Sequence, residues 1–366
     1  MTPIYVTKSY LPPLDEYVRY LQQIWETNQL TNNGALVREL EEKLKVFLGV
    51  KHIFFVSNGT IALQIAIKAL NLKDEIITTP FSYVATTSSI VWEGCQPVFV
   101  DIDPIMLSIN PDLIEKAITP HTTGILATHV YGYPCDVEGI QAIADRHGLK
   151  VIYDAAHAFG VHYKGQSLLN QGDIATLSFH ATKLFHTVEG GALVTNDDEV
   201  AKRIAYMRNF GHKNLVEIWG LGINGKNSEF HAAMGLCLLP KIPQIVADRK
   251  SICEEYDRLL QDSDLERPKF RTGTCYNYSY YPVLFPLEKY LLESIANLNA
   301  KSIYPRRYFY PSLNKLNYVK DQPMPFAEDC ASRVLCLPLY HDLEPVQVQD
   351  ICAQLISTQE GMKGVQ

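Results

Sequence analysis

The order of apolar and polar positions predicts strands and helices that alternate through the first two thirds of the chain. Apolar residues at helical spacing predict helices at 14–25 and 35–48. The short run His52–Val56, rich in aromatic and β-branched residues, predicts a strand. The further expected strands are 75–79, 97–100, 124–129, 150–154, 174–179 and 192–196, and the further expected helices are 61–70, 85–92, 111–117 and 137–147. Such alternation indicates an α/β fold whose mostly parallel sheet is covered on both faces.

The pattern changes after residues 240–243, a short segment that begins and ends with proline. A long charged helix is expected at 245–260, a strand at 278–284 and a last helix at 345–357. We therefore expect a large domain at residues 1–245, which includes the two N-terminal helices, and a smaller α+β domain at residues 246–366. A length of 366 residues agrees with about two domains.

Composition and charge exclude several classes of protein. Hydrophobic residues make up 47% and charged residues 20% of the chain, which excludes a disordered protein. A net charge of −7 without a long basic run argues against a nucleic-acid partner. The start of the chain does not resemble a signal peptide, and no stretch predicts a membrane span. The eight cysteines form no CxxC pair, which favours reduced thiols in a cytoplasmic protein.

The first candidate for chemistry is Asn58-Gly59-Thr60, between a predicted strand and a predicted helix. A helix N-terminus binds anions through its free N–H groups and its positive dipole end, and glycine lets an oxyanion approach the backbone. The Thr60 hydroxyl adds a donor. The alternative is an ordinary glycine turn with a threonine cap. The segment is neither a GxxxxGK[ST] nor a GxGxxG motif, so a dinucleotide at this position is disfavoured.

The second candidate is Asp154, at the carboxyl end of an apolar strand. Ligands of open α/β sheets bind at that edge, and a carboxylate there can hold a protonated ring nitrogen. Ala155 and Ala156 leave room for a flat ring, and His157 could touch the same ring. The alternative is a helix-capping aspartate followed by a core histidine.

The third candidate is Lys183, in the loop after the predicted strand 174–179. A lysine on such a loop can form an imine if its amine is partly desolvated. Ser178 can donate to a phosphate from the strand end. Taken alone, Lys183 would be interpreted as a solvated surface lysine. His180 and His186 do not have the spacing of zinc ligands on a helix, so no metal is expected.

Together the three candidates match the requirements of pyridoxal 5′-phosphate. This cofactor needs an anion site for its phosphate, a carboxylate beside its pyridine nitrogen and a lysine for its aldehyde. The chain offers these groups in that order, on a predicted α/β sheet.

Three segments, 58–63, 153–158 and 178–192, resemble the DegT-type sugar aminotransferases. The resemblance covers nearly the whole chain, from residues 39–41 to residues 336–340. It implies the aspartate-aminotransferase-like fold of pyridoxal-phosphate enzymes of fold type I, with a mostly parallel seven-stranded sheet in the large domain. The implied reaction transfers an amino group from L-glutamate to a nucleotide-linked keto sugar. The third segment is most similar to members that convert dTDP-4-dehydro-6-deoxyglucose into dTDP-4-amino-4,6-dideoxyglucose, which implies a role in surface polysaccharide (O-antigen) biosynthesis.

The resemblance also implies roles for single residues. Lys183 would hold the cofactor aldehyde and carry protons, Asp154 would pair with the pyridine nitrogen, and His157 would lie near the ring hydroxyl. The other implied cofactor contacts are Asn58, Gly59, Thr60, Ser178 and the ring-stacking Tyr83. Asn224 would reach the phosphate of the other subunit, which implies a homodimer with shared active sites. Its segment departs from the usual Gly-x-Asn-Tyr-Arg pattern.

The last part of the chain is rich in tyrosine between residues 276 and 310. Tyrosine rings suit the faces of sugars and bases, and arginine suits a diphosphate. Arg306, Arg307 and Tyr310 are therefore candidates for substrate contact. The alternative is that most of these tyrosines pack in the core.

Three other functions remain as alternatives. A sugar C3 aminotransferase would use the same chemistry on a different carbon. A non-catalytic or regulatory protein would bind the same cofactor. A sugar dehydratase of this fold is disfavoured, because the dehydratases that resemble this family carry histidine where Lys183 stands.

Overall fold

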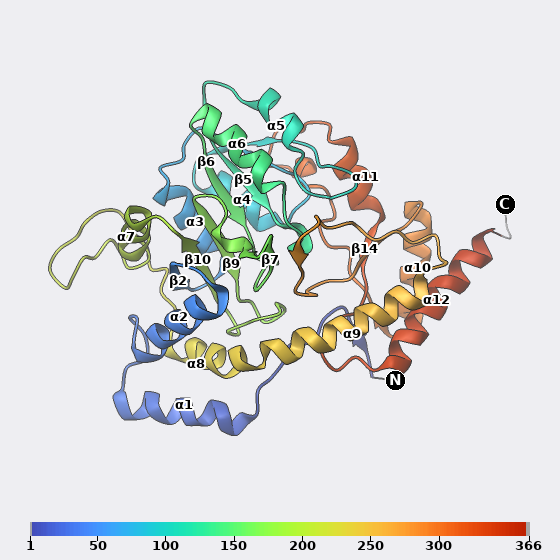
Figure 1. The fold of residues 1–366 in the computed structure, drawn as a ribbon, viewed down its shortest axis with the longest axis horizontal. Helices are drawn as coiled ribbons and strands as arrows, with labels where there is room; N and C mark the ends of the chain where they lie inside the picture. The colour runs from blue at the N-terminus through green and yellow to red at the C-terminus, as the bar shows by residue number, and fades with distance from the viewer. Residues whose placement is uncertain (1, 364–366) are drawn as a thin grey trace.

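The computed structural model describes residues 2–363, and a seven-stranded sheet forms its centre (Figure 1). From edge to edge the strands are β2 (His52–Val56), β10 (Gly191–Thr195), β9 (Ile174–Ser178), β6 (Lys150–Asp154), β5 (Thr122–Thr128), β3 (Glu75–Thr78) and β4 (Gln96–Phe99). Six of the seven strands run in the same direction, and β10 runs opposite to them. The predicted mostly parallel sheet is confirmed, and the ends of its strands lie within two residues of the expected positions.

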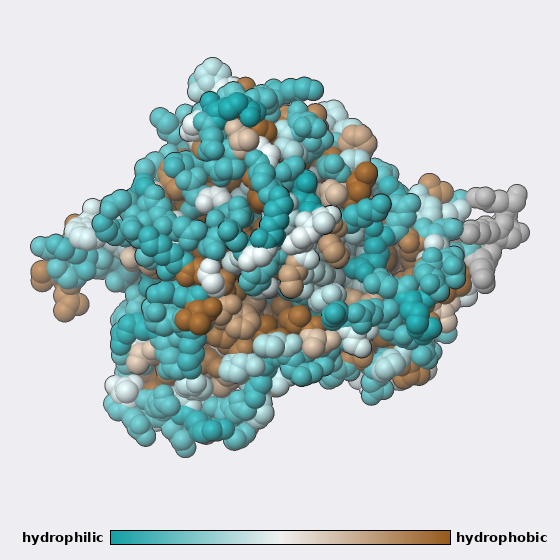
Figure 2. Space-filling view, viewed as in Figure 1, coloured by the Kyte–Doolittle hydropathy of each residue, from teal (hydrophilic) through white to brown (hydrophobic). Residues whose placement is uncertain are grey.

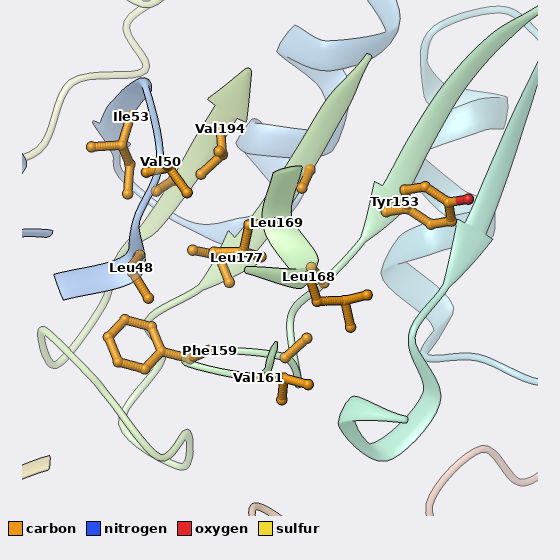
Figure 3. Close-up of a cluster of buried hydrophobic side chains, with 14 of the residues drawn as sticks. Leu48, Val50, Ile53, Tyr153, Phe159, Val161, Leu168, Leu169, Leu177 and Val194 are labelled. Atoms are coloured by element: carbon orange, nitrogen blue, oxygen red, sulfur yellow. The ribbon is translucent and has the colours of Figure 1, made fainter. Parts of the chain in front are cut away.

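Helices cover both faces of this sheet. One face is covered by α3 (Gly59–Ala69), α4 (Val84–Trp92) and α7 (Asp198–Met207). The other is covered by α2 (Ala35–Leu48), α5 (Pro111–Ala117), α6 (Val137–His147) and α8 (Glu229–Leu238). Strand side chains alternate between the two layers, since Val151 and Tyr153 belong to the second layer and Ile152 to the first. Figure 3 shows Leu48, Ile53, Leu177 and Val194 gathered in the second layer.

Local capping explains why the crossover helices begin where they do. The Asn58 side chain accepts a hydrogen bond from the backbone N–H of Ile61 at the start of α3, over 2.8 Å. Asp136 and Asp197 cap α6 and α7 in the same way.

The C-terminal part has its own buried cluster, which extends from Ile252 to Leu355. Its helices are α9 (Ile242–Leu260), α10 (Glu288–Ala300), α11 (Pro325–Arg333) and α12 (Pro345–Lys363), and its strands are β11 (Thr274–Cys275), β12 (Pro282–Leu284), β13 (Ile303–Tyr304) and β14 (Val334–Cys336). The expected boundary near residue 245 lies within α9, and the division into two domains stays a prediction.

The remaining elements connect these parts. Helix α1 (Leu14–Thr27) lies alongside α8, and the first strand, β1 (Ile4–Tyr5), pairs with β13. Strand β7 (His162–Tyr163) pairs with β8 (Gln166–Ser167) and β11. One helical stretch in the described chain, Glu229–Leu260, is long and apolar enough to cross a membrane. Just over half of its most apolar window, 56%, is buried inside the fold, as in the core helix of a globular protein.

The predicted strand at 278–284 is wrong in its first half. Only Pro282–Leu284 forms strand β12, and the preceding residues are irregular. Tyr278 has a φ of 51°, which lies outside the extended region that regular strands occupy. Side chains hold this irregular segment: Arg249 donates to the Ser279 carbonyl, and the Tyr276 hydroxyl donates to the Tyr280 carbonyl. Helices α7, α8, α10 and α11 are elements that the sequence pattern did not predict.

Candidate active site

The loops that carry the candidate residues meet at one edge of the sheet. The parallel strands β2, β9, β6 and β3 place their carboxyl ends there, and the reversed β10 places its amino end there. A cavity of about 250 Å³ lies at this edge. Its walls include the predicted residues Asn58, Gly59, Thr60, Tyr83, Asp154, His157, Ser178, Lys183 and Arg306. The structure thus brings together residues that lie far apart in the sequence.

The N-terminus of α3 forms one end of the cavity. Because Asn58 caps only the N–H of Ile61, the N–H groups of Gly59 and Thr60 at the helix start have no intrahelical partner. Ser178 lies directly beside them: a Cβ added to Gly59 would come within 3.0 Å of the Ser178 Cβ. These donors together form an anion site.

A second glycine allows this close approach. A Cβ added to Gly191, the first residue of β10, would lie only 2.5 Å from the carbonyl of Asn58. No side chain fits at that distance. Because residue 191 is glycine, the start of β10 can pack directly against the backbone of the anion site.

Asp154 is a buried carboxylate whose hydrogen-bond partners are uncharged. It is 5% exposed, and it accepts hydrogen bonds from the Thr86 hydroxyl at 2.7 Å and the Ala156 N–H at 3.1 Å. Since the Thr86 hydroxyl has one hydrogen, Ser82 must donate to Thr86 and Thr128 to Ser82 along this chain of hydroxyls. Burial raises the pKa of Asp154, while the Thr86 hydrogen bond opposes that rise. Such a carboxylate favours a cationic ligand.

Lys183 carries an amine that loses its proton readily. Burial lowers the pKa of Lys183 to about 8, while the negative charge of Asp154 opposes the shift and the positive charge of Arg306 adds to it. The amine lies 3.4 Å from the hydroxyl of Tyr280. A lysine with this pKa offers a substantial fraction of neutral, nucleophilic amine near neutral pH.

His157 forms a buried, neutral wall of the cavity. Its Nδ1 accepts a hydrogen bond from the N–H of Tyr131 at 3.2 Å, so the ring hydrogen of the neutral form is on Nε2. Burial holds the pKa of His157 well below its usual value, and the charge of Lys183 lowers it further. The ring lies between Tyr280 and Phe309, with centroid distances of 4.6 and 5.6 Å.

Three predicted residues do not line the cavity. The Arg307 guanidinium bonds to the Glu288 carboxylate at 2.6 Å and lies 3.6 Å from the centre of the Tyr310 ring. Asn224 is exposed, and its side chain accepts a hydrogen bond from Lys226 at 2.7 Å. Of the paired arginines, only Arg306 faces the cavity.

Sequence reasoning missed several residues of the site. Tyr280, Tyr308 and Phe309 line the cavity from the C-terminal part of the chain. Thr86 in the first turn of α4 supports Asp154, together with Ser82 in the loop after β3 and Thr128 at the end of β5. The signal for the hydroxyl chain was the presence of Ser82 and Thr86 after the apolar strand β3. No local pattern separates Tyr280 from the neighbouring tyrosines. Among residues 2–363, no three His, Cys, Asp or Glu side chains are grouped as a metal site requires.

The fold is that of the pyridoxal-phosphate enzymes of fold type I, in which a lysine, a buried carboxylate and a helix N-terminus face one cavity. The sequence profile of the DegT/DnrJ/EryC1/StrS aminotransferase family matches residues 14–356. The chain belongs to this family of aminotransferases.

Relatives of known name are similar over nearly their whole length. A dTDP-4-amino-4,6-dideoxy-D-glucose transaminase of Shigella dysenteriae is 44% identical, over 97% of this chain and 98% of the relative. An enzyme of the same name from Escherichia coli is 42% identical, over 96% of this chain and 97% of the relative. Among solved structures, DesI in the presence of its TDP-sugar product has a TM-score of 0.94 at 30% identity and covers 100% of this chain, which covers 95% of DesI.

Proposed function

We propose that this aminotransferase uses pyridoxal 5′-phosphate to transfer an amino group from L-glutamate to dTDP-4-dehydro-6-deoxyglucose, giving dTDP-4-amino-4,6-dideoxyglucose. The observation that carries the proposal is the cavity in which Lys183 and Asp154 face the N-terminus of α3. The dTDP sugar is supported by the two transaminases at 44% and 42% identity, which match this chain over nearly its full length.

The residues of the cavity fit this cofactor. Asp154 is buried among uncharged hydrogen-bond partners, which suits a protonated pyridine nitrogen. The α3 N-terminus and Ser178 suit a phosphate, and the amine of Lys183 suits an aldehyde. Tyr83, which is 52% exposed at the cavity, offers a ring face for stacking.

When bound, the cofactor supplies an electron sink that lets an amino acid release its α-proton. The chain provides the groups around it. Lys183 takes up and returns a proton at Nζ, for which a pKa of about 8 is suited. Asp154 remains ionised beside a cationic ring. The neutral His157 keeps its Nε2 hydrogen available for an oxygen atom.

The test combines trapping with product analysis. The holoenzyme is expected to be yellow, to bleach with L-glutamate and to recover its colour with the correct keto sugar from a panel of nucleotide-linked keto sugars. Borohydride reduction should attach the cofactor to Lys183. Lys183→Ala should fold normally and lose turnover entirely. Normal turnover by that variant, or trapping at another side chain, would refute the proposal.

The same experiment separates the alternatives. A C3 aminotransferase would give a product with its amino group on carbon 3, which product identification shows directly. A non-catalytic cofactor-binding protein would not bleach with glutamate. The combination of anion site, carboxylate and lysine in one cavity favours catalysis.

We also propose a homodimer with shared active sites, which acts in the cytoplasm in surface polysaccharide (O-antigen) biosynthesis. The dimer is supported by the segment 209–225, named the arm here, which protrudes beyond α7 (Figure 1). Leu215, Val216 and Leu221 on the arm are 98%, 88% and 75% exposed, and apolar side chains gather at its tip (Figure 2). Such a patch fits a second copy of the chain, to which the arm would bring Asn224.

A further inference from the structure

Tyr280 is the hydrogen-bond partner of the Lys183 amine. The amine donates to its hydroxyl at 3.4 Å, and the Tyr280 ring packs against His157 with a centroid distance of 4.6 Å. Tyr280 lies almost one hundred residues after Lys183 and belongs to the irregular segment that precedes β12. It therefore closes the cavity from the C-terminal part of the chain.

The backbone of Tyr280 is fixed by a second tyrosine. The Tyr276 hydroxyl accepts a hydrogen bond from the Tyr280 N–H at 3.2 Å and lies within hydrogen-bond distance of two carbonyls, those of Tyr280 (3.1 Å) and Tyr131 (2.9 Å). Tyr131 follows β5, and its N–H bonds to His157. Tyr276 thus ties the segment that carries Tyr280 to the wall of the cavity formed by the central sheet.

A buried guanidinium holds the residues just before Tyr280. Arg249 is 4% exposed, and it donates to the carbonyls of Ser279 at 3.1 Å and Tyr278 at 3.5 Å. Burying a charge among carbonyl groups is costly, and water cannot replace these hydrogen bonds. These hydrogen bonds hold residues 278–279 in an irregular conformation. That conformation sets the position of the Tyr280 hydroxyl in the cavity.

We propose that Tyr280 is a positioning residue for Lys183, whose hydroxyl fixes the amine at the His157 side of the cavity. This inference rests on the proposed function of Lys183. A lysine side chain has four rotatable bonds, and a hydrogen bond at its end reduces the arrangements open to the amine whenever it is free.

The contact has a consequence for the titration of the amine. A hydroxyl that accepts a hydrogen bond from the ammonium form stabilises that form, so its removal lowers the pKa of Lys183 further. The other groups around the amine would be unchanged in such a variant. They are Asp154, His157, His180, Glu189, Arg306 and Tyr308.

The first test uses the full-length protein without cofactor. Brief acetic anhydride pulses at a series of pH values, followed by mass spectrometry of the Lys183 peptide, give the midpoint of amine titration. The wild type should titrate at about 8. Tyr280→Phe, which keeps the ring, should lower the midpoint by roughly one unit. Tyr278→Phe, two residues earlier and outside the cavity, should leave it unchanged.

The second test uses the enzyme loaded with pyridoxal phosphate. Tyr280→Phe should bind the cofactor as the wild type does and unfold at a similar temperature, while its rate of bleaching by L-glutamate falls by about 10- to 100-fold. Should Tyr280→Phe fail to fold, Tyr276→Phe keeps the Tyr280 hydroxyl, frees its backbone and should lower the midpoint in the same direction.

An unchanged titration midpoint in the folded variants would overturn the role of Tyr280. This result is distinct from failure of the proposed function, in which Lys183 of the wild type would not take up pyridoxal phosphate at all. A folded Tyr280→Phe enzyme that bleaches at the wild-type rate would also overturn the inference.

Discussion

At the scale of single residues, burial moves the pKa values of Asp154 and Lys183 toward each other. Desolvation raises the pKa of the carboxyl group and lowers that of the amine, because both charged forms lose water in the same cavity. A cationic ring beside Asp154 would favour its charged form. Burial thus disfavours the charged forms of both residues, which lie at the two positions where the proposed cofactor would bind.

The first prediction concerns the pH dependence of stability without cofactor. Because folding raises the pKa of Asp154, the folded state binds its proton more tightly than the unfolded state, and the carboxyl group destabilises the fold as pH rises above its ordinary range. Asp154→Asn removes this effect. The hydroxyl chain can reverse its hydrogen bonds and accept from the amide.

Melting temperatures from about pH 4 to pH 7 check this prediction, since an ordinary carboxyl group titrates at the lower end of that range. Asp154→Asn should gain stability over the wild type as pH rises, and its aminotransferase activity should fall by roughly 100-fold or more. A constant difference in melting temperature across the range would contradict the argument.

The second prediction separates the neighbouring arginines. Arg306 lines the cavity, whereas Arg307 pairs with Glu288 outside it. Arg306→Gln should raise KM for an anionic substrate by about tenfold or more, because a charge-assisted hydrogen bond is lost. Arg307→Gln should lower the melting temperature and leave KM near the wild-type value. Steady-state kinetics with L-glutamate and the nucleotide sugar distinguish the two, and equal changes in KM would contradict the assignment.

At the scale of elements, the anion site depends on close packing between one helix and two strands of the sheet. The N-terminus of α3, the end of β9 and the start of β10 converge around Asn58, Gly59, Ser178 and Gly191. The strands and α3 were predictable from periodicity, since their apolar patterns are local. The distances between these elements were not predictable, because they follow from the strand order β2-β10-β9 in the sheet.

The third prediction compares the two glycines of this junction. An added Cβ at Gly191 meets backbone atoms at 2.5 Å, whereas at Gly59 it meets the Ser178 side chain at 3.0 Å. Gly191→Ala should destabilise the protein by about 1–3 kcal/mol and weaken cofactor binding. Gly59→Ala should cost less stability and act mainly on cofactor affinity. Thermal unfolding and cofactor titration measure both effects, and an equal loss of stability in the two variants would contradict this geometry.

At the scale of the whole molecule, residues from the C-terminal part complete the wall of the cavity. The arm protrudes from the rest of the fold. Tyr280, Arg306 and Tyr308 reach the sheet edge from beyond α9. The arm carries its exposed apolar side chains on the far side of the molecule from α10 and α12 (Figure 1).

The fourth prediction concerns the proposed dimer. Replacing Leu215 and Val216 together with glutamate should shift the protein from dimer to monomer, because charged groups would enter an apolar contact. Activity should fall with dimer content. Val346→Glu is the control, since Val346 is 55% exposed on α12, away from the arm. Size-exclusion chromatography with light scattering measures the mass, and a dimeric double variant would argue against the role of the arm.

The order of apolar and polar residues predicted the central sheet and most of the helices around it, and it placed Asp154 and Asn58-Gly59-Thr60 at strand ends. Lys183 follows its strand on a loop, so it became a candidate only in combination with these groups. Which of the tyrosines and arginines from residue 276 onward face the cavity could not be predicted, because it depends on the folded chain. Their directions depend on the irregular segment before β12, which is held by Arg249 and Tyr276 from other positions in the chain. Contacts between distant segments leave no periodic trace in the sequence, so the prediction of a strand failed at the segment that brings Tyr280 to Lys183.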